Sequence, residues 1–218
     1  MVRYSGSSPV FAVLLASRPI QPVAAQDGTP EVGAEGTPSA GPIAVTLLDT
    51  EAENEGTVTF TEVDGRVTIS GTVEGLTPGE HGIHVHETGV CVIGEEMAFS
   101  SAGGHYNPTG TRHGGPSMLD ATPPAAGSPT LMGTPGTTIG HAGDLGNITA
   151  DNAGTAQVEI STDRFSLAEL SDTDGSALVI HANPDDLQTD PAGNSGPRVV
   201  CGVIFAPMGT PTAGTPAS

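Results

Sequence analysis

Apolar and polar residues alternate along short stretches in the middle of the chain, which is the pattern of half-buried β-strands. In the stretch Thr57–Val63, Val58 and Phe60 fall on one face. The dipeptide Asp64-Gly65 follows, which is a typical hairpin turn, and the alternation then resumes. The eight predicted strands are Ile43–Leu48, Thr57–Val63, Arg66–Gly75, Glu80–His86, Asp144–Ala150, Ala156–Ser161, Ser176–His181 and Val199–Phe205.

Short strands separated by glycine, proline and aspartate predict an all-β fold, either a sandwich or a barrel. Only Ser166–Asp172 is compatible with a helical turn. Two long loops, Cys91–Tyr106 and His113–Gly143, interrupt the strand pattern. Loops of this length in a compact domain are usually functional or disordered. The second loop contains Thr122–Thr138, whose glycine- and proline-rich composition predicts a mobile insertion.

The first 25 residues differ in composition from the strand region. Arg3 is followed by the short apolar run Val10–Ala16 and by the small residues Val23-Ala24-Ala25, an order that resembles a secretory signal peptide. The alternatives are a disordered leader and a start codon assigned at the wrong place. The apolar run is too short for a membrane span, which needs about 20 apolar residues. We therefore expect an exported protein.

Two further segments, residues 26–42 and 207–218, are small, polar and rich in glycine and proline. Such segments bury too little apolar surface to offset the entropy of ordering, so we interpret them as a disordered linker and tail. The predicted folded domain then covers residues 43–206.

The charge of the chain is strongly acidic, with 6 basic residues, all arginine, against 25 aspartates and glutamates. This balance argues against a nucleic-acid partner and against binding to an anionic membrane surface. An anionic substrate would need a local positive site to overcome this background.

The chain has two cysteines, Cys91 and Cys201. In an exported protein they are expected to form one disulfide, and two free buried thiols are the alternative if the leader is not a signal. Closing so long a loop would stabilise the fold by roughly 4–5 kcal/mol on the chain-entropy model.

Three of the seven histidines lie within the stretch His81–His86. Side chains two apart share one face of a strand, so His84 and His86 can bind one ion while His81 points elsewhere. A lone histidine is more often a core residue than a ligand, and we interpret His81 in that way. Neutral imidazole is a favoured ligand of copper and zinc, and a carboxylate can complete a zinc site. The remaining candidates are His105, His113, His141, Asp144 and His181.

Six motifs occur in order along the chain: GEHGIHVHETGVC, SAGGHYNP, RHGGP, HAGDLGNITAD, LVIHANPDDL and GNSGPRVVCGVI. Together they closely resemble copper–zinc superoxide dismutase from about Ile43 to Phe205. The resemblance implies an eight-stranded Greek-key β-barrel, related to the immunoglobulin-like sandwich, with copper and zinc held against its outside by the two long loops. It also implies dismutation of superoxide to dioxygen and hydrogen peroxide, as antioxidant defence outside the cytoplasm.

The resemblance further assigns roles to single residues. His105 matches a histidine that bridges copper and zinc and takes part in catalysis, and Asp185 matches a carboxylate that joins ligands of the two metals through hydrogen bonds. Arg198 matches a catalytic arginine beside the copper that attracts and orients superoxide. Cys91 and Cys201 match the family disulfide. The matching copper ligands are His84, His86, His105 and His181, and the matching zinc ligands are His105, His113, His141 and Asp144.

The chain also departs from the family. The segment Asp186–Arg198 is short and has no lysine, so Arg198 is expected to guide the anion nearly alone. The extended loops are more similar to those of bacterial exported members, which favours a periplasmic, cell-envelope or extracellular location. A homodimer is left open, because dimer surfaces differ between groups. The main alternative function is metal buffering or delivery without turnover, and a purely structural barrel is a third.

Overall fold

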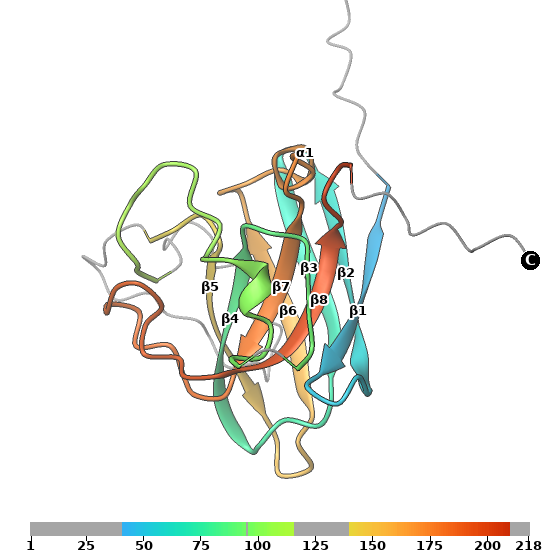
Figure 1. Cartoon of the computed structure of the whole chain (residues 1–218), viewed down its shortest axis with the longest axis vertical. Coiled ribbons are helices and arrows are strands. Elements are labelled where there is room, and N and C mark those ends of the chain that lie inside the picture. The colour runs from blue at the N-terminus through green and yellow to red at the C-terminus, as the bar shows by residue number, and fades with distance from the viewer. Residues whose placement is uncertain (1–40, 95, 116–139, 210–218) are drawn as a thin grey trace, which may run out of the picture. The chain divides into compact units, whose positions relative to one another are not determined.

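The computed structural model describes residues 41–94, 96–115 and 140–209 (Figure 1). The predicted signal peptide, almost all of the predicted linker and tail, and the insertion Thr122–Thr138 lie outside the described residues. These assignments therefore stay predictions.

The described part of the chain forms eight strands, as the alternation pattern predicts. Two of them have the predicted bounds, and the others shift at an end. The largest shift is in the second strand, which begins at Asn54 rather than Thr57, because Asn54 pairs with Leu48 of the first strand beyond a bulge in the second strand itself. The strands are β1 (Ile43–Asp49), β2 (Asn54–Val63), β3 (Arg66–Val73), β4 (Gly79–His86), β5 (Asp144–Ala150), β6 (Ala156–Thr162), β7 (Ser176–His181) and β8 (Arg198–Phe205).

These strands form a closed antiparallel barrel in the order β1-β2-β3-β6-β5-β4-β7-β8. The pairing of Leu48 with Cys201 joins β1 to β8 and closes it. β3 lies beside β6, and β4 lies beside β7. The connection from β3 to β4 and the connection from β6 to β7 therefore each join strands that are not neighbours, as in a Greek key. The predicted all-β barrel is confirmed. Each of the described strands therefore has a strand neighbour on both sides.

Alternate side chains of the strands fill the barrel interior. Val58 and Phe60 of β2 are fully buried, and so are Val67 and Ile69 of β3, which is the face that the sequence pattern predicts. In contrast, Val63 at the end of β2 is 61% exposed. Burial of these apolar surfaces is the main force that drives barrel formation.

A second, smaller apolar cluster lies on the outside of the barrel. Ala177 and Val179 of β7 point away from the interior and pack against Phe99 and Ala102 of the first long loop. This loop contains a short 3-10 helix, η1 (Ser100–Ala102), whose Ala102 belongs to this outer cluster. The first long loop is thereby fixed to the barrel wall.

The predicted helical turn is confirmed as α1 (Leu167–Leu170). Ser166 and Glu169 form a capping box, in which each side chain bonds the other's backbone N–H. Within the described ranges, no helix is long and apolar enough to cross a membrane.

Candidate metal centre

Strand β4 presents two histidines on the outside of the barrel. Ile83 and Val85 belong to the barrel core, so His84 and His86 between and after them point the opposite way. Both histidines are nevertheless fully buried, because the long loops cover this outer face. The shared face predicted from their spacing is confirmed.

Backbone hydrogen bonds bring both long loops to β4. The carbonyl of Val85 accepts a bond from the N–H of Tyr106 at 2.8 Å, and the N–H of Val85 donates to the carbonyl of Gly143 at 2.9 Å. A side chain at position 143 would collide with the backbone, since its Cβ would lie 2.2 Å from the Val85 oxygen. Glycine therefore allows the close approach that places His105 and His141 beside β4.

Four histidines meet over β4 and β7. One ring nitrogen from each lies within 4.8 Å of the others. The rings of His84 and His105 stack with centroids 3.9 Å apart, and the ring of His181 lies 4.9 Å from that of His84. We call this the first set; its members are His84, His86, His105 and His181.

A second group of ligand-type side chains shares one member with the first. His105, His113, His141 and Asp144 offer ligand atoms that also lie within 4.8 Å of one another, and we call them the second set. Asp144 is fully buried at the start of β5, where its Oδ2 accepts the N–H groups of His141 at 2.8 Å and Gly114 at 3.1 Å. Its carboxylate is therefore held by the turn that carries His141.

The histidine rings have a bonding pattern that fits metal ions. In His86 and His181 the Nδ1 atom bonds to the carbonyls of Gly103 and Gly196, while the buried Nε2 atom has no hydrogen-bond partner among the described residues. An unsatisfied buried nitrogen is unfavourable by about 1–3 kcal/mol, so the cost indicates a bound partner. The other unsatisfied ring nitrogens are His84 Nδ1, His105 Nε2, His113 Nδ1 and His141 Nδ1.

Asp185 links the two sets. Its Oδ2 accepts a bond from His84 Nε2 at 2.7 Å, and its Oδ1 accepts one from His113 Nε2 at 2.8 Å. These bonds leave the Nδ1 atom of each ring directed to its set, as is usual for histidines that bind metals. Gly193 packs against this carboxylate, since a Cβ there would lie 1.7 Å from Asp185 Oδ1.

Burial governs the protonation of three histidines of the first set, His84, His86 and His181. Desolvation lowers the pKa of His84 to about 3 and that of His181 to about 4, and it holds the pKa of His86 well below its ordinary value. These imidazoles are therefore neutral at pH 7 without any metal, which is the form that binds copper or zinc.

The buried carboxylates of Asp144 and Asp185 reverse the effect of burial at His113 of the second set. Burial alone would lower the pKa of His113, but the nearby carboxylate of Asp144 and the hydrogen bond to Asp185 raise it to about 9. Burial likewise opposes ionisation of Asp144 and Asp185, yet their hydrogen bonds to histidines hold the pKa of each carboxyl well below its ordinary value. Both carboxylates are therefore charged at neutral pH.

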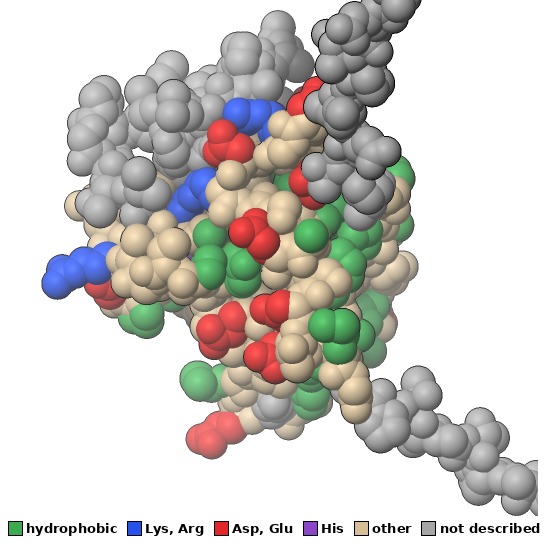
Figure 2. Space-filling model, turned by 90° about the horizontal axis from the view of Figure 1, so that it is seen from above, with side chains coloured by type: hydrophobic (Ala, Val, Ile, Leu, Met, Phe, Trp, Pro, Cys, Tyr) green, Lys and Arg blue, Asp and Glu red, His purple; other side chains and the backbone are tan. Residues whose placement is uncertain are grey.

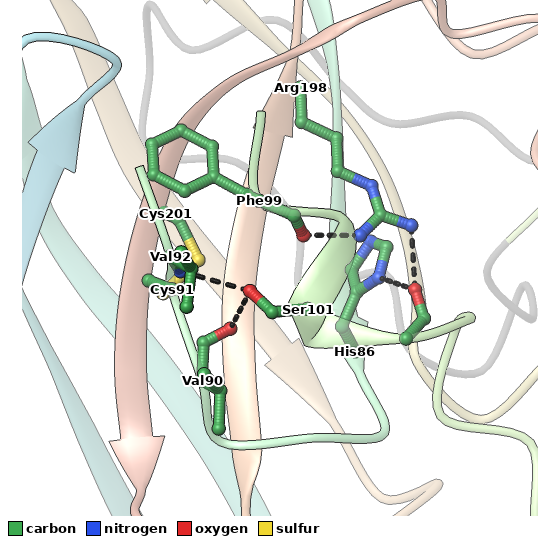
Figure 3. Close-up of a disulfide and its surroundings, with 9 residues drawn as sticks. His86, Val90, Cys91, Val92, Phe99, Ser101, Arg198 and Cys201 are labelled. Carbon is green, nitrogen blue, oxygen red and sulfur yellow. Dashed lines mark hydrogen bonds between the residues drawn. A yellow bond between two sulfur atoms is a disulfide. The ribbon is translucent and has the colours of Figure 1, made fainter. Parts of the chain in front are cut away.

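Arg198 lies at the start of β8 beside the first set (Figure 3). Its Nη1 donates to the carbonyl of Phe99 and its Nη2 to that of Gly103, both at 2.6 Å. The same Gly103 carbonyl is 3.1 Å from His86 Nδ1. The first long loop therefore fixes the position of the guanidinium relative to His86, a histidine of the first set.

A disulfide ties this loop to the barrel. Cys91 and Cys201 are bonded, which confirms the predicted pair. Ser101 adds a second link within the loop, because its Oγ donates to the carbonyl of Val90 and accepts the N–H of Val92 (Figure 3).

His81 belongs to neither set. It is buried, and its ring nitrogens both lie 2.7 Å from carbonyl oxygens, Nδ1 from that of His181 and Nε2 from that of Thr77. The interpretation of His81 as a satisfied core histidine agrees with these contacts.

Several residues that support the site were not predicted. Asn147 brackets the backbone of Asp185, because its Oδ1 accepts the Asp185 N–H at 2.7 Å and its Nδ2 donates to the Asp185 carbonyl at 2.9 Å. Arg164 donates to the carbonyls of His141 and Asp144. Asn147 stands in the quoted motif HAGDLGNITAD, which is a usable signal, whereas no motif points to Arg164.

Charged side chains are unevenly distributed on the face shown in Figure 2. Acidic side chains are scattered among uncharged ones, and the arginines gather toward one side. The net charge of −19 would by itself repel anions, so a site for an anion depends on local cations such as Arg198.

Comparison with known proteins agrees with this geometry. The family model described as copper/zinc superoxide dismutase matches residues 54–204. The chain belongs to the copper/zinc superoxide dismutase family. As a member of that family it is a superoxide dismutase, and its cofactors are copper and zinc.

Solved structures of copper/zinc superoxide dismutases and similar proteins share the fold. A double mutant of a SOD-like protein from Bacillus subtilis is 35% identical, with a TM-score of 0.59 over 75% of this chain and 97% of that one. The Cu/Zn superoxide dismutase from Brucella abortus is 29% identical, also with a TM-score of 0.59, over 75% of this chain and 99% of that one. The clock protein EA4 is 32% identical, with a TM-score of 0.56 over 77% of this chain and 96% of that one.

Proposed function

We propose that this protein dismutes superoxide at a copper ion held by the first set, with His105 bridging that copper to a zinc ion held by the second set. The observation that carries the proposal is that His105 belongs to both the first set and the second set. Its Nε2 is unsatisfied, and its Nδ1 lies 2.7 Å from Asp144 Oδ1 in the second set. One imidazole with its two nitrogens directed to two ligand groups is suited to bridge two ions.

Copper, when bound, would supply a one-electron redox couple that can oxidise one superoxide and reduce the next. The formation of hydrogen peroxide also needs two protons. His105 is suited to handle one of them, because Nδ1 is fixed by the second set and Nε2 is the atom that can hold a proton and return it. Arginine would not serve in this role, since its guanidinium does not lose a proton in proteins.

Arg198 would attract and orient the anion. Its guanidinium carries a permanent charge and is held by the carbonyls of Phe99 and Gly103. Fixed cations focus anions into a site even on a protein of negative net charge. Zinc has no redox chemistry, so the second set would hold the loops and the orientation of His105.

We also propose that the protein works outside the cytoplasm, as antioxidant defence in the periplasm, the cell envelope or the medium. The disulfide between Cys91 and Cys201 supports this, because such bonds persist mainly in oxidising compartments. N-terminal sequencing of the mature protein from fractionated cells tests it. A mature chain that begins near residue 26 in the exported fraction is expected, and an uncleaved chain in the cytoplasm would contradict the proposal.

The activity is tested by the decay of a superoxide pulse with protein loaded with copper and zinc, compared with metal-free protein. Fast, metal-dependent decay at catalytic protein concentrations is expected. If the protein retains copper without accelerating the decay, metal buffering or delivery becomes the better account.

The variant Arg198→Gln separates catalysis from metal retention. We expect at least a tenfold loss of superoxide turnover with little change in copper retention. Arg66→Gln is the matched control, since it removes the same charge from the exposed pair of Arg66 with Asp163. Equal turnover in wild type and Arg198→Gln would refute the role of Arg198.

A further inference from the structure

The sheet is split at one end of the barrel, next to the second set. Ala150 of β5 pairs with Ala156 of β6, and a continued ladder would place Asp144 opposite Thr162. The ladder stops after that first pair, so the two strands separate toward Asp144. The carbonyls at this end of β5 that face β6 therefore need hydrogen-bond partners other than β6.

Arg164 supplies those partners. It follows β6, where its N–H bonds to Thr162 Oγ1 at 3.2 Å. Its Nη1 donates to the carbonyl of Asp144 at 2.9 Å, and its Nη2 donates to the carbonyl of His141. One planar guanidinium thus spans the open end of the sheet and joins both ends of a single turn.

This turn carries two members of the second set. The Asp144 N–H closes it by bonding the His141 carbonyl at 3.0 Å, and Asp144 Oδ2 accepts the His141 N–H at 2.8 Å. The Arg164 side chain adds bonds on the carbonyl side of the same turn. Arg164 comes from a different element, so it fixes the turn relative to the barrel and not only within itself.

We propose that Arg164 is a positioning residue for zinc, which holds His141 and Asp144 in place before the metal binds. This inference rests on the zinc ligands of the proposed function. The direction in which removal of Arg164 changes the affinity for zinc distinguishes positioning from a simple charge effect. A cation this close to a divalent ion repels it, so a residue acting through charge alone would weaken zinc binding, and its removal would strengthen binding. A residue that positions the ligands would do the opposite.

The test uses the full chain and measures Zn²⁺ affinity by competition with a chelator. We expect Arg164→Gln to bind Zn²⁺ at least about tenfold more weakly, the lower end of the loss usual for residues that orient metal ligands. The visible absorption of bound Co²⁺ is expected to change as well, because it reports the geometry of the ligands. Arg66→Gln, with a side chain 40% exposed and an ion pair to Asp163, is expected to match wild type in both measurements.

Equal or tighter Zn²⁺ binding by Arg164→Gln would overturn the inference. If that variant does not fold, Arg164→Lys decides, because it keeps the charge but loses the planar pair of donors; affinity equal to wild type would overturn the inference. His141→Gln separates this result from the proposed ligand set. If it binds Zn²⁺ as tightly as wild type, the ligand set itself is wrong, whatever Arg164 does.

Discussion

Replacing Asp185 by asparagine tests the link between the two sets. The carboxylate is buried and accepts one hydrogen bond from His84 and one from His113. Asparagine has nearly the same shape, but only one of its two terminal atoms accepts. The other is an NH₂ group, which would face a ring N–H of one histidine, donor against donor. That histidine then loses the bond that directs its Nδ1 to the metal.

The size of the effect follows from the bonds that are changed. A hydrogen bond to a charged group contributes about 1.5–3 kcal/mol. Loss of one such bond corresponds to a factor of about 10–150 in affinity, since 1.4 kcal/mol is tenfold. Measured losses for partners of metal-bound histidines, about 10–100-fold, fall in the same range. We therefore expect Asp185→Asn to weaken the binding of copper, zinc or both by about 10–100-fold.

The assay is chelator competition for each metal in turn, on the metal-free protein. Asp186→Asn is the matched control, because Asp186 is the next residue and its carboxylate is exposed, bonding to Gln188, Thr189 and Asn194 within its own loop. It is expected to match wild type. Unchanged affinity for both metals in Asp185→Asn would refute the reasoning that the Asp185 bonds orient His84 and His113.

Three further predictions concern the stability of the metal-free protein, measured as the free energy of unfolding in urea. Removing the disulfide with Cys91→Ala and Cys201→Ala should lower the free energy of unfolding by roughly 5 kcal/mol on the chain-entropy model, because the two residues are 110 apart in the sequence. A loss below about 1 kcal/mol would contradict that model for this protein. Phe60→Ala should cost about 3–5 kcal/mol because Phe60 is fully buried, while Val63→Ala, at a position 61% exposed, should stay within about 0.5 kcal/mol of wild type; equal effects would place Phe60 outside the core. Stability should also fall as the pH drops below about 6.5, because His84, His86 and His181 have folded pKa values below those of the unfolded chain, so the unfolded state binds more protons. Each of these three histidines can contribute up to about 1.4 kcal/mol of stability per pH unit. His113, whose pKa is raised, does not offset this loss below pH 6.5, because it is protonated there in both the folded and the unfolded chain. Constant stability from pH 7 to pH 5 would show that the three histidines are not buried as neutral rings.

The strands were predictable because their signal is local. The apolar pattern of β5 lies between Gly143 and Asp151, that of β7 lies between Gly175 and Asn183-Pro184, and the predicted bounds of both strands match the structure. The start of β2 was not predictable in this way, because Asn54 is polar and joins the strand by pairing with Leu48 of β1. Register with a neighbouring strand is a property of the assembled sheet.

The candidate ligands were also predictable, since their residue types and the order of their motifs stand in the sequence. The contacts that support them were not. Asn147 bonds to Asp185, and Arg164 bonds to His141 and Asp144, across separations that no local pattern reports. Such partners become visible only when the strands that carry them are placed side by side.

By itself, the sequence determined the strands, the face that His84 and His86 share, and the chemical types of the candidate ligands. It could do so because alternation and residue chemistry are encoded within a few neighbouring positions. Only the tertiary structure decided which nitrogen of each imidazole is left for a metal. That choice depends on the partner of the other nitrogen, and Asp185, Gly103 and Gly196 reach these rings from distant segments once the barrel has closed.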